Sequence, residues 1–143
     1  MALALLLALR EAGFKVQPFK VGPDYIDPTH LEKAASRKPY NLDGFFLDEE
    51  GLLALFRHGA KGADFALIEG VMGLFDGKDP LGEEGSTAQV ARRLKTPVAL
   101  VVDAKGMAGS IAPLALASGT STPGCGWWGS SPIGWARSAT PRS

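Results

Sequence analysis

Residues 14–27 read Phe-Lys-Val-Gln-Pro-Phe-Lys-Val-Gly-Pro-Asp-Tyr-Ile-Asp, which is typical of a β-strand that ends in a tight turn. The expected strand runs from Phe14 to Lys20, and the Val-Gly-Pro turn ends it. Pro18 places this strand near a sheet edge or a bulge, because proline has no N–H to donate to a neighbouring strand. The turn then carries two carboxylates, Asp24 and Asp27.

Two later apolar runs, Phe65-Ala-Leu-Ile68 and Pro97-Val-Ala-Leu-Val-Val102, predict two further strands, both buried. Helical patterns alternate with the strands. The predicted helices cover residues 1 to about 13, 29 to about 36, 49–58, 86–94 and 107–116. Strands that alternate with helices predict an α/β fold, in which a doubly wound, mostly parallel sheet carries helices on both faces.

The ends of three helices have local signals. The first helix is apolar all round, which suits a helix buried against a sheet, and no capping residue precedes it. Its apolar run is too short for a membrane span and lacks the features of a signal peptide. Thr29 and Glu32 have the spacing of a capping box, and Asp48 is a candidate N-cap for the helix that follows it.

Composition bounds the class of partner. The chain has 143 residues, 45% of them hydrophobic, which is enough for one domain with its own core. Fifteen Lys and Arg balance fifteen Asp and Glu, so no basic field attracts nucleic acid or an anionic membrane. A single cysteine, Cys125, excludes an internal disulfide and favours a cytoplasmic protein. Small molecules or protein surfaces are the expected partners.

The character of the sequence changes near Ala117. Residues 117–143 are rich in Ser, Gly, Pro and Trp, contain no acidic residue, and show neither a helical nor a strand period. We therefore expect a domain over residues 1–116 and an irregular tail over residues 117–143. The tail is either a disordered terminus or the result of a reading frame lost near residue 117.

Carboxylates follow two of the predicted strands and indicate a metal or phosphate site. Asp24 and Asp27 lie in one loop, and Glu69 directly follows the buried run Phe65–Ile68. Strand ends of a parallel sheet meet at one edge, where open α/β sheets bind ligands. Carboxylate oxygens suit Mg²⁺. The structural alternative is that each aspartate only caps a turn, but an acid at a buried strand end is not there for packing.

Glycines follow Glu69 and extend the candidate site. Gly70, Gly73 and Gly77 permit a tight loop whose N–H groups face a phosphate or a substrate carboxylate, and Asp76 ends that loop. Lys20, at the end of the first strand, is a candidate to neutralise such an anion, against the alternative of an ordinary solvated lysine.

These residues carry a resemblance to a known family. Five segments resemble, in order, the amino-terminal synthetase domain of cobyrinic acid a,c-diamide synthase: Phe19 to Pro28, Asn41-Leu-Asp43, Ile68 to Gly77, Gly85-Ser-Thr-Ala88 and Val101-Val-Asp-Ala-Lys-Gly-Met-Ala108. The resemblance covers about residues 1 to 116. It implies a P-loop NTPase-like fold similar to that of dethiobiotin synthetase and the ParA/MinD group.

The resemblance also implies an activity. Enzymes of this family are carbon–nitrogen ligases of cobalamin biosynthesis that amidate the a and c carboxylates of a corrinoid. They use ATP and Mg²⁺, and they take ammonia from glutamine through a separate glutaminase domain. A carboxylate is a poor electrophile, so ATP would phosphorylate it and ammonia would displace phosphate from the acyl phosphate. The implied partners are a corrinoid and the glutaminase domain, and a homodimer is left open.

The family resemblance assigns roles by position. It implies that Asp24, Asp27 and Glu69 hold the metal and order the nucleotide phosphates. It implies that substrate lies against Tyr25 and Asp76, with Asp76 also serving ammonia entry or the choice of carboxylate. The expected site residues are catalytic Asp24, Asp27, Glu69 and Asp76, and substrate-binding Lys20, Tyr25, Ile26, Gly70 and Gly73.

The chain also departs from the family pattern. Family members begin with a strand and a Gly-rich loop that ends Gly-Lys-Thr and cradles the phosphates, and no such segment occurs here. The glutaminase domain is also missing from these 143 residues. We therefore expect a truncated domain that neither binds ATP tightly nor forms amide product. Two alternatives stay open, a dethiobiotin-synthetase-like ligase and a non-enzymatic ParA/MinD-like nucleotide switch.

Overall fold

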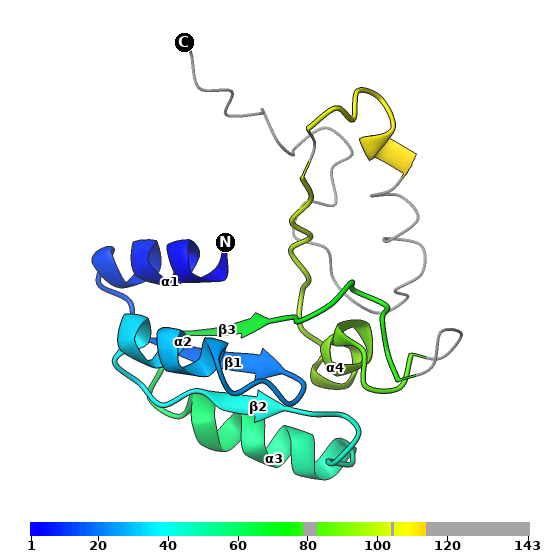
Figure 1. The fold of residues 1–143 in the computed structure, drawn as a ribbon. Coiled ribbons are helices and arrows are strands. Elements are labelled where there is room, and N and C mark those ends of the chain that lie inside the picture. The colour runs from blue at the N-terminus through cyan, green and yellow to red at the C-terminus, as the bar shows by residue number, and fades with distance from the viewer. Residues whose placement is uncertain (79–82, 104, 114–143) are drawn as a thin grey trace. The chain divides into compact units, whose positions relative to one another are not determined.

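A computed structural model describes residues 1–78, 83–103 and 105–113 (Figure 1). The chain divides into two compact units, Met1–Leu94 and Lys95–Ser143. The labelled helices and strands all belong to the first unit, which is described first. The predicted irregular tail, residues 117–143, lies outside the described residues.

The first unit is built on a small parallel sheet. Its strands are β1 (Val16–Val21), β2 (Tyr40–Leu42) and β3 (Phe65–Glu69), in the order β2-β1-β3. Both neighbouring pairs are parallel. The predicted α/β class with a parallel sheet is therefore confirmed for these three strands. Strand β2 was not predicted, because three residues with only Leu42 buried are too few to show a strand period.

Pro18 lies in the central strand, so its predicted place near a sheet edge is wrong. The hydrogen-bonded register of β1 with β2 begins only at Phe19, one residue later. Pro18 therefore has a strand partner on one side alone, Leu67 of β3. A proline is tolerated here because no residue of β2 stands opposite it.

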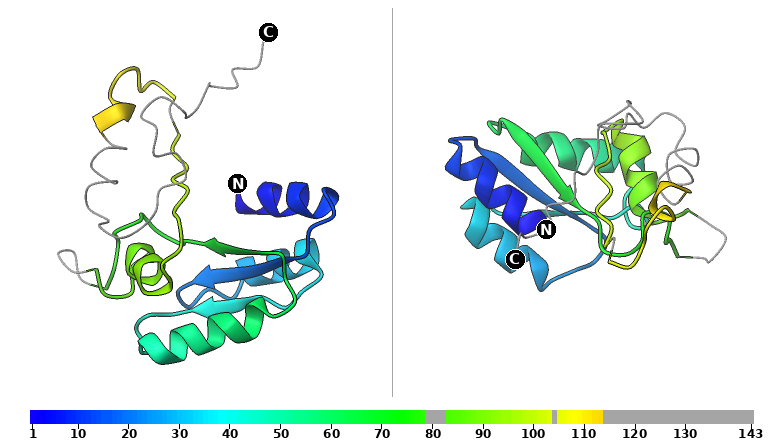
Figure 2. Two further views of the ribbon diagram at one scale, coloured as in Figure 1. Left: turned by 180° about the vertical axis from the view of Figure 1, so that it is seen from behind. Right: turned by 90° about the horizontal axis from the view of Figure 1, so that it is seen from above.

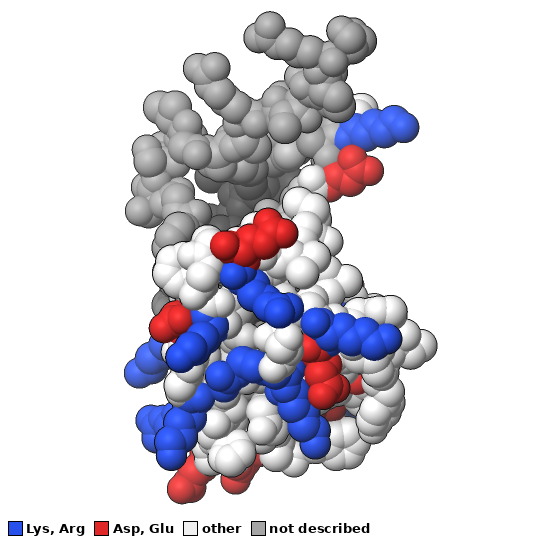
Figure 3. All heavy atoms as spheres, turned by 90° about the vertical axis from the view of Figure 1, so that its left-hand side faces the viewer, with Lys and Arg blue, Asp and Glu red and all other residues white. Residues whose placement is uncertain are grey.

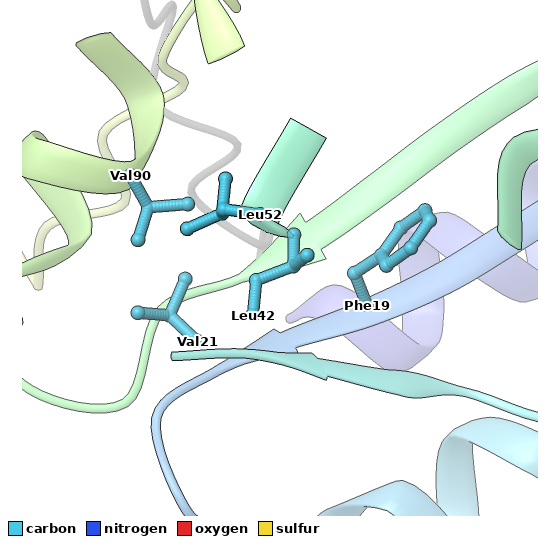
Figure 4. Packing of buried hydrophobic residues seen from close by; sticks show 5 residues of the cluster. All are labelled: Phe19, Val21, Leu42, Leu52 and Val90. Atoms are coloured by element: carbon cyan, nitrogen blue, oxygen red, sulfur yellow. The ribbon is translucent and has the colours of Figure 1, made fainter. Parts of the chain in front are cut away.

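Helices cover both faces of the sheet. On one face, helix α1 (Ala2–Glu11) and helix α2 (Asp27–Ala35) pack a cluster of buried residues consisting of Leu6, Val16, Leu31 and Ala35. On the other face, helix α3 (Glu49–Ala60) and helix α4 (Thr87–Leu94) enclose a second cluster, Phe19, Val21, Leu42, Leu52 and Val90 (Figure 4). Figure 2 shows the sheet between the α1–α2 layer and α3. The alternation of Val16, Phe19 and Val21 between the clusters follows the two-residue period of a strand.

Two elements are more exposed than predicted. Helix α1 fully buries only Leu6 and partly buries Leu9, and its leucines at positions 3, 5 and 7 are exposed. Strand β3 forms an edge of the described sheet, and Phe65 at its start is 44% exposed. The expected burial of both elements is wrong for one reason. Among the described residues, α1 packs along one side only, and β3 pairs with a strand, β1, along one edge only.

The two predicted N-caps differ in outcome. Asp48 caps α3, and its Oδ1 accepts the N–H of Gly51 at 2.8 Å, as predicted. Helix α2 begins at Asp27, two residues before the predicted Thr29, and no side chain caps it. The capping box is therefore wrong. Proline suits the first turn of a helix, so Pro28 allows α2 to start before Thr29. Thr29 therefore lies inside the helix, where its hydroxyl donates to the carbonyl of Ile26 at 2.7 Å.

The described part of the second unit departs from the prediction. Within Pro97–Val102 only Val98 forms an isolated bridge, and Val101 is 65% exposed. The predicted buried strand is therefore wrong in the described residues, because an apolar run forms a strand only where a neighbouring strand pairs with it over several residues. Helix begins at residue 111 and not at 107, and residues 114–116 lie outside the described part.

Basic side chains gather at the end of the first unit where the strands begin, on the face shown in Figure 3. The last turns of α1, α2 and α3 all carry basic residues, Arg10, Lys33 and Arg57. Cations at helix C-termini interact favourably with the helix dipole, which accounts for these residues without an anionic partner. In the described part of the chain, no helix is both long and apolar enough to cross a membrane.

Candidate functional site

The candidate site begins at the carboxyl ends of β1 and β3. Lys20 and Glu69 are register partners on these neighbouring parallel strands. Side chains at paired positions share a face of the sheet, so both point to the face that α1 and α2 cover. The ammonium of Lys20 donates to Oε2 of Glu69 at 3.1 Å. The strand ends therefore place one cation beside one carboxylate.

The loop from β1 to α2 brings two more carboxylates to the same ammonium. Gly22, with φ +82°, turns the chain out of the strand in a backbone conformation that side chains rarely adopt. The Nζ of Lys20 lies 3.4 Å from Oδ2 of Asp24 and 2.6 Å from Oδ2 of Asp27. As expected for acids at strand ends, Asp24, Asp27 and Glu69 converge at one edge of the sheet.

Lys20 is the buried member of this cluster. Its side chain is 3% exposed, against 21% for Asp24, 50% for Asp27 and 26% for Glu69. Burial on its own lowers the pKa of Lys20, but the hydrogen bonds and charges of Asp27 and Glu69 raise it by more. The net result is a pKa of Lys20 above its ordinary value of 10.5, so the group is a fixed positive charge at neutral pH.

Backbone groups orient Asp24. Its Oδ1 accepts the N–H of Ile26 at 2.9 Å and the N–H of Asp27 at 3.4 Å. The hydrogen bond from Ile26 is the main cause of a lowered pKa of Asp24, with smaller contributions from the N–H of Asp27 and from Lys20, while burial opposes the shift. Asp24 is therefore an oriented carboxylate at neutral pH.

Asn41 of β2 fixes this loop, and sequence reasoning did not identify it as a site residue. Its Nδ2 donates to the carbonyl of Gly22 at 3.0 Å and to the carbonyl of Asp24 at 2.8 Å. Asn41 also stands opposite Lys20 in the register of β1 and β2. Its only sequence signal was its membership of the segment Asn41-Leu-Asp43, which resembled the family, because β2 itself was not recognised.

The Gly-rich loop after β3 is held by its own hydrogen bonds. Oδ2 of Asp76 accepts the N–H of Gly73 at 2.9 Å, so this N–H does not point to a free anion site. A Cβ at Gly70 would lie 2.7 Å from Oγ1 of Thr87, which shows that Gly70 packs closely on the start of α4. Asp76 contacts its own loop and is not among the acids that surround Lys20.

A pocket of about 540 Å³ lies between the two loops. It is lined by the end of β1, the β1–α2 loop, the β3–α4 loop and the start of α4: Val21, Gly22, Pro23, Asp24, Tyr25, Ile26, Val71, Met72, Asp76, Gly77, Gly85 and Thr87. Three apolar lining side chains are strongly exposed, Tyr25 at 83%, Ile26 at 73% and Met72 at 71%. Of the carboxylates around Lys20, only Asp24 reaches this pocket.

The arrangement of the three carboxylates does not match a metal centre. Among the residues that the structure describes, no group of three or more His, Cys, Asp or Glu side chains is arranged to hold a metal ion. Asp24, Asp27 and Glu69 each direct one oxygen at the ammonium of Lys20 instead. As they stand, these residues do not fit Mg²⁺, and the predicted metal role stays a prediction.

Comparisons with known proteins identify relatives of this chain. It is 53% identical over 114 residues to the cobyrinate a,c-diamide synthase of Syntrophotalea carbinolica, covering 80% of this chain and 25% of that protein. It is 50% identical over 113 residues to the hydrogenobyrinate a,c-diamide synthase of Streptomyces coelicolor, covering 79% and 23%. The enzyme of the same name from Mycobacterium tuberculosis is 52% identical over 117 residues, covering 79% and 26%.

The resemblance inferred from five short segments is confirmed by these relatives. The chain is similar to part of the cobyrinate and hydrogenobyrinate a,c-diamide synthases, and it spans about a quarter of the length of the curated relatives it matches. No family model matches the chain, and no solved structure matches it.

Proposed function

We propose that this chain contributes to the ATP-dependent amidation of the a and c carboxylates of cobyrinic or hydrogenobyrinic acid, with glutamine as the source of ammonia. The observation that carries the proposal is the identity of 50–53% with enzymes named for this amidation. ATP and Mg²⁺ are the cofactors that it implies, and a corrinoid and a glutaminase domain are the partners. We further propose a cytoplasmic location and a P-loop NTPase-like fold.

The proposed reaction has two steps. A carboxylate oxygen of the corrinoid attacks the γ-phosphorus of ATP, the bond to the β,γ-bridging oxygen breaks, and ADP leaves. Ammonia then attacks the acyl carbon, phosphate leaves, and the nitrogen loses a proton to form the amide. Both reactants of the first step are anions, so positioning and charge neutralisation are what the protein must supply.

The described residues contribute to positioning, because they order the loop from β1 to α2, but they do not neutralise a bound anion, since three carboxylates surround the one ammonium of Lys20. Lys20 provides a permanent positive charge at the sheet edge, because its raised pKa keeps it protonated. The carboxylates of Asp24, Asp27 and Glu69 hold that charge in place from three sides. We assign no step to a magnesium ion, since these carboxylates are engaged with Lys20.

The pocket beside Asp24 is suited to the substrate. Tyr25, Ile26 and Met72 offer exposed apolar surface at its wall, and Asp76 is the second acid that lines it. Small-molecule pockets hold their ligands mostly through apolar contact, and a few polar groups fix the orientation of the ligand. We therefore propose that a corrinoid lies against Tyr25, Ile26 and Met72, with Asp76 near the carboxylate to be amidated.

Binding of cobyrinic acid to the 143-residue chain tests this proposal. The visible absorption of the corrinoid reports binding, and we expect the variant Ile26→Ala to bind about tenfold more weakly, as is typical for truncation of one apolar contact. Phe46→Ala is the matched control, because Phe46 is also 72% exposed and does not line the pocket.

Three results would count against the proposal. The first is the absence of any saturable change in the corrinoid spectrum. The second is binding of diaminopelargonic acid in place of the corrinoid, which would favour a dethiobiotin-synthetase-like ligase. The third is nucleotide-dependent dimerisation without corrinoid binding, which would favour a ParA/MinD-like switch.

A further inference from the structure

We propose that the ammonium of Lys20 is the resident cation of the carboxylate cluster, and that it excludes a divalent metal ion from Asp24, Asp27 and Glu69 in the ligand-free chain. The proposal concerns a residue of this chain and does not depend on the amidation reaction. It explains why three acids can lie together at one sheet edge without a metal ion.

The hydrogen-bonding capacity of the ammonium matches its surroundings. A lysine ammonium has three N–H donors and no acceptor. The Nζ of Lys20 donates hydrogen bonds to Asp27 at 2.6 Å and to Glu69 at 3.1 Å, and Oδ2 of Asp24 lies 3.4 Å away as the partner of an ion pair. Each acid therefore points one oxygen at the same centre, and that centre is the nitrogen of Lys20.

A divalent ion would need the same oxygens. Mg²⁺ binds carboxylate oxygens at about 2.0–2.1 Å and favours near-octahedral geometry. An ion held by Asp27 and Glu69 together would lie within a few ångströms of the Lys20 ammonium, where two positive charges repel strongly. The ion and the ammonium therefore compete for one position.

Lys20 is poorly placed to move aside. Its side chain is 3% exposed, and its backbone is paired on both sides, with Asn41 of β2 and Glu69 of β3. The acids are more exposed, from 21% to 50%, so solvent reaches the oxygens that do not face Lys20. Removal of the ammonium would leave the carboxylates accessible and without a cation.

Direct titration with Mn²⁺ tests the competition, and electron paramagnetic resonance of the free ion gives the bound fraction. We expect the wild-type chain to show no saturable binding that depends on Glu69. Lys20→Met keeps a long side chain without the charge, and we expect it to bind Mn²⁺ at least about tenfold more tightly than wild type. Adding Glu69→Gln to Lys20→Met should abolish this increase in Mn²⁺ affinity.

The matched control is Lys15→Met, which removes an exposed lysine that directly precedes β1, at the opposite end of the strand from Lys20, and should leave Mn²⁺ binding unchanged. Circular dichroism checks that each variant folds. Mn²⁺ binding by Lys20→Met that is no tighter than wild type would overturn the proposal. Mn²⁺ binding by the wild-type chain that is lost in Glu69→Gln would also overturn it. If Lys20→Met does not fold, the comparison of wild type with Glu69→Gln decides the matter alone.

Discussion

Gly59 is the position where one added methyl group should have the clearest effect on stability. It lies buried in the last turn of α3, against Phe19 of β1 and Tyr40 of β2. A Cβ at this position would lie 2.9 Å from Cε1 and Cζ of Phe19 and 2.9 Å from Cδ2 of Tyr40. These atoms belong to rigid rings, so the contact cannot be relieved by rotation of a flexible chain end.

Two opposing effects set the size of the change. Alanine in place of glycine favours the helix by up to about 1 kcal/mol. Overpacking of a close-packed core costs about 1–3 kcal/mol, and the upper part of that range applies here because Phe19 is 0% exposed and also packs on Phe56 with ring centroids 5.1 Å apart. We expect Gly59→Ala to lower the free energy of unfolding by about 1–2 kcal/mol.

Urea denaturation followed by circular dichroism measures this change. The matched variant is Gly59→Ala in a Phe19→Leu background, where the smaller side chain removes the Phe19 contacts. We expect the cost of Gly59→Ala to shrink by about 1 kcal/mol in that background, since residues in contact are not additive. A Gly59→Ala chain at least as stable as wild type would refute the packing argument, because the helix preference would then equal or exceed the cost of overpacking.

Three further predictions concern hydrogen bonds and charge. Asp48→Ala should lower the free energy of unfolding by about 1 kcal/mol through loss of the N-cap of α3, whereas Asp48→Asn should retain most of it, and equal urea midpoints for the two would contradict this. Arg37→Met removes hydrogen bonds to Gln17 at 2.7 Å and to the carbonyl of Lys61 at 2.9 Å, and we expect the free energy of unfolding to fall by about 1–3 kcal/mol, so an unchanged urea midpoint would exclude a structural role. Folding lowers the pKa of Asp24, so its charged carboxylate stabilises the fold at pH values above the ordinary pKa of 3.8. This contribution is lost as the pH falls through the folded-state pKa. Asp24→Asn should therefore destabilise the chain at pH 7 and much less at pH 3, and a difference that does not depend on pH would argue against the charge.

The elements that sequence predicted best are those whose local pattern is complete. The helix from Glu49 has a capping aspartate and an amphipathic pattern, and the structure places its cap at Asp48. Strand Phe65–Glu69 followed from its apolar run and its abrupt end at an acid. Local signals of this kind act within one turn or one strand, so they do not depend on which elements become neighbours.

Apart from the capping box at Thr29 and the short strand β2, the errors concern neighbours and not local structure. Pro18 was predicted near an edge, but whether a proline is tolerated depends on where the next strand begins, and β2 begins at the level of Phe19. Helix α1 was predicted to be buried because it is apolar all round, yet only Leu6 is buried. An apolar pattern shows which residues are able to be buried, but the number of layers around an element decides which of them are.

The candidate site shows the same division between local pattern and register. The convergence of Asp24, Asp27 and Glu69 could be predicted, because parallel strands bring their carboxyl ends to one edge whatever their order. What stands at the centre of the three acids depends on register, and Lys20 meets Glu69 only because β1 and β3 pair at that residue. A shift of one residue would turn Lys20 to the opposite face, where Phe19 and Val21 pack. An interpretation of clustered acids as a metal centre therefore requires the strand register, since a buried lysine at the paired position can hold the same oxygens that a metal ion would use.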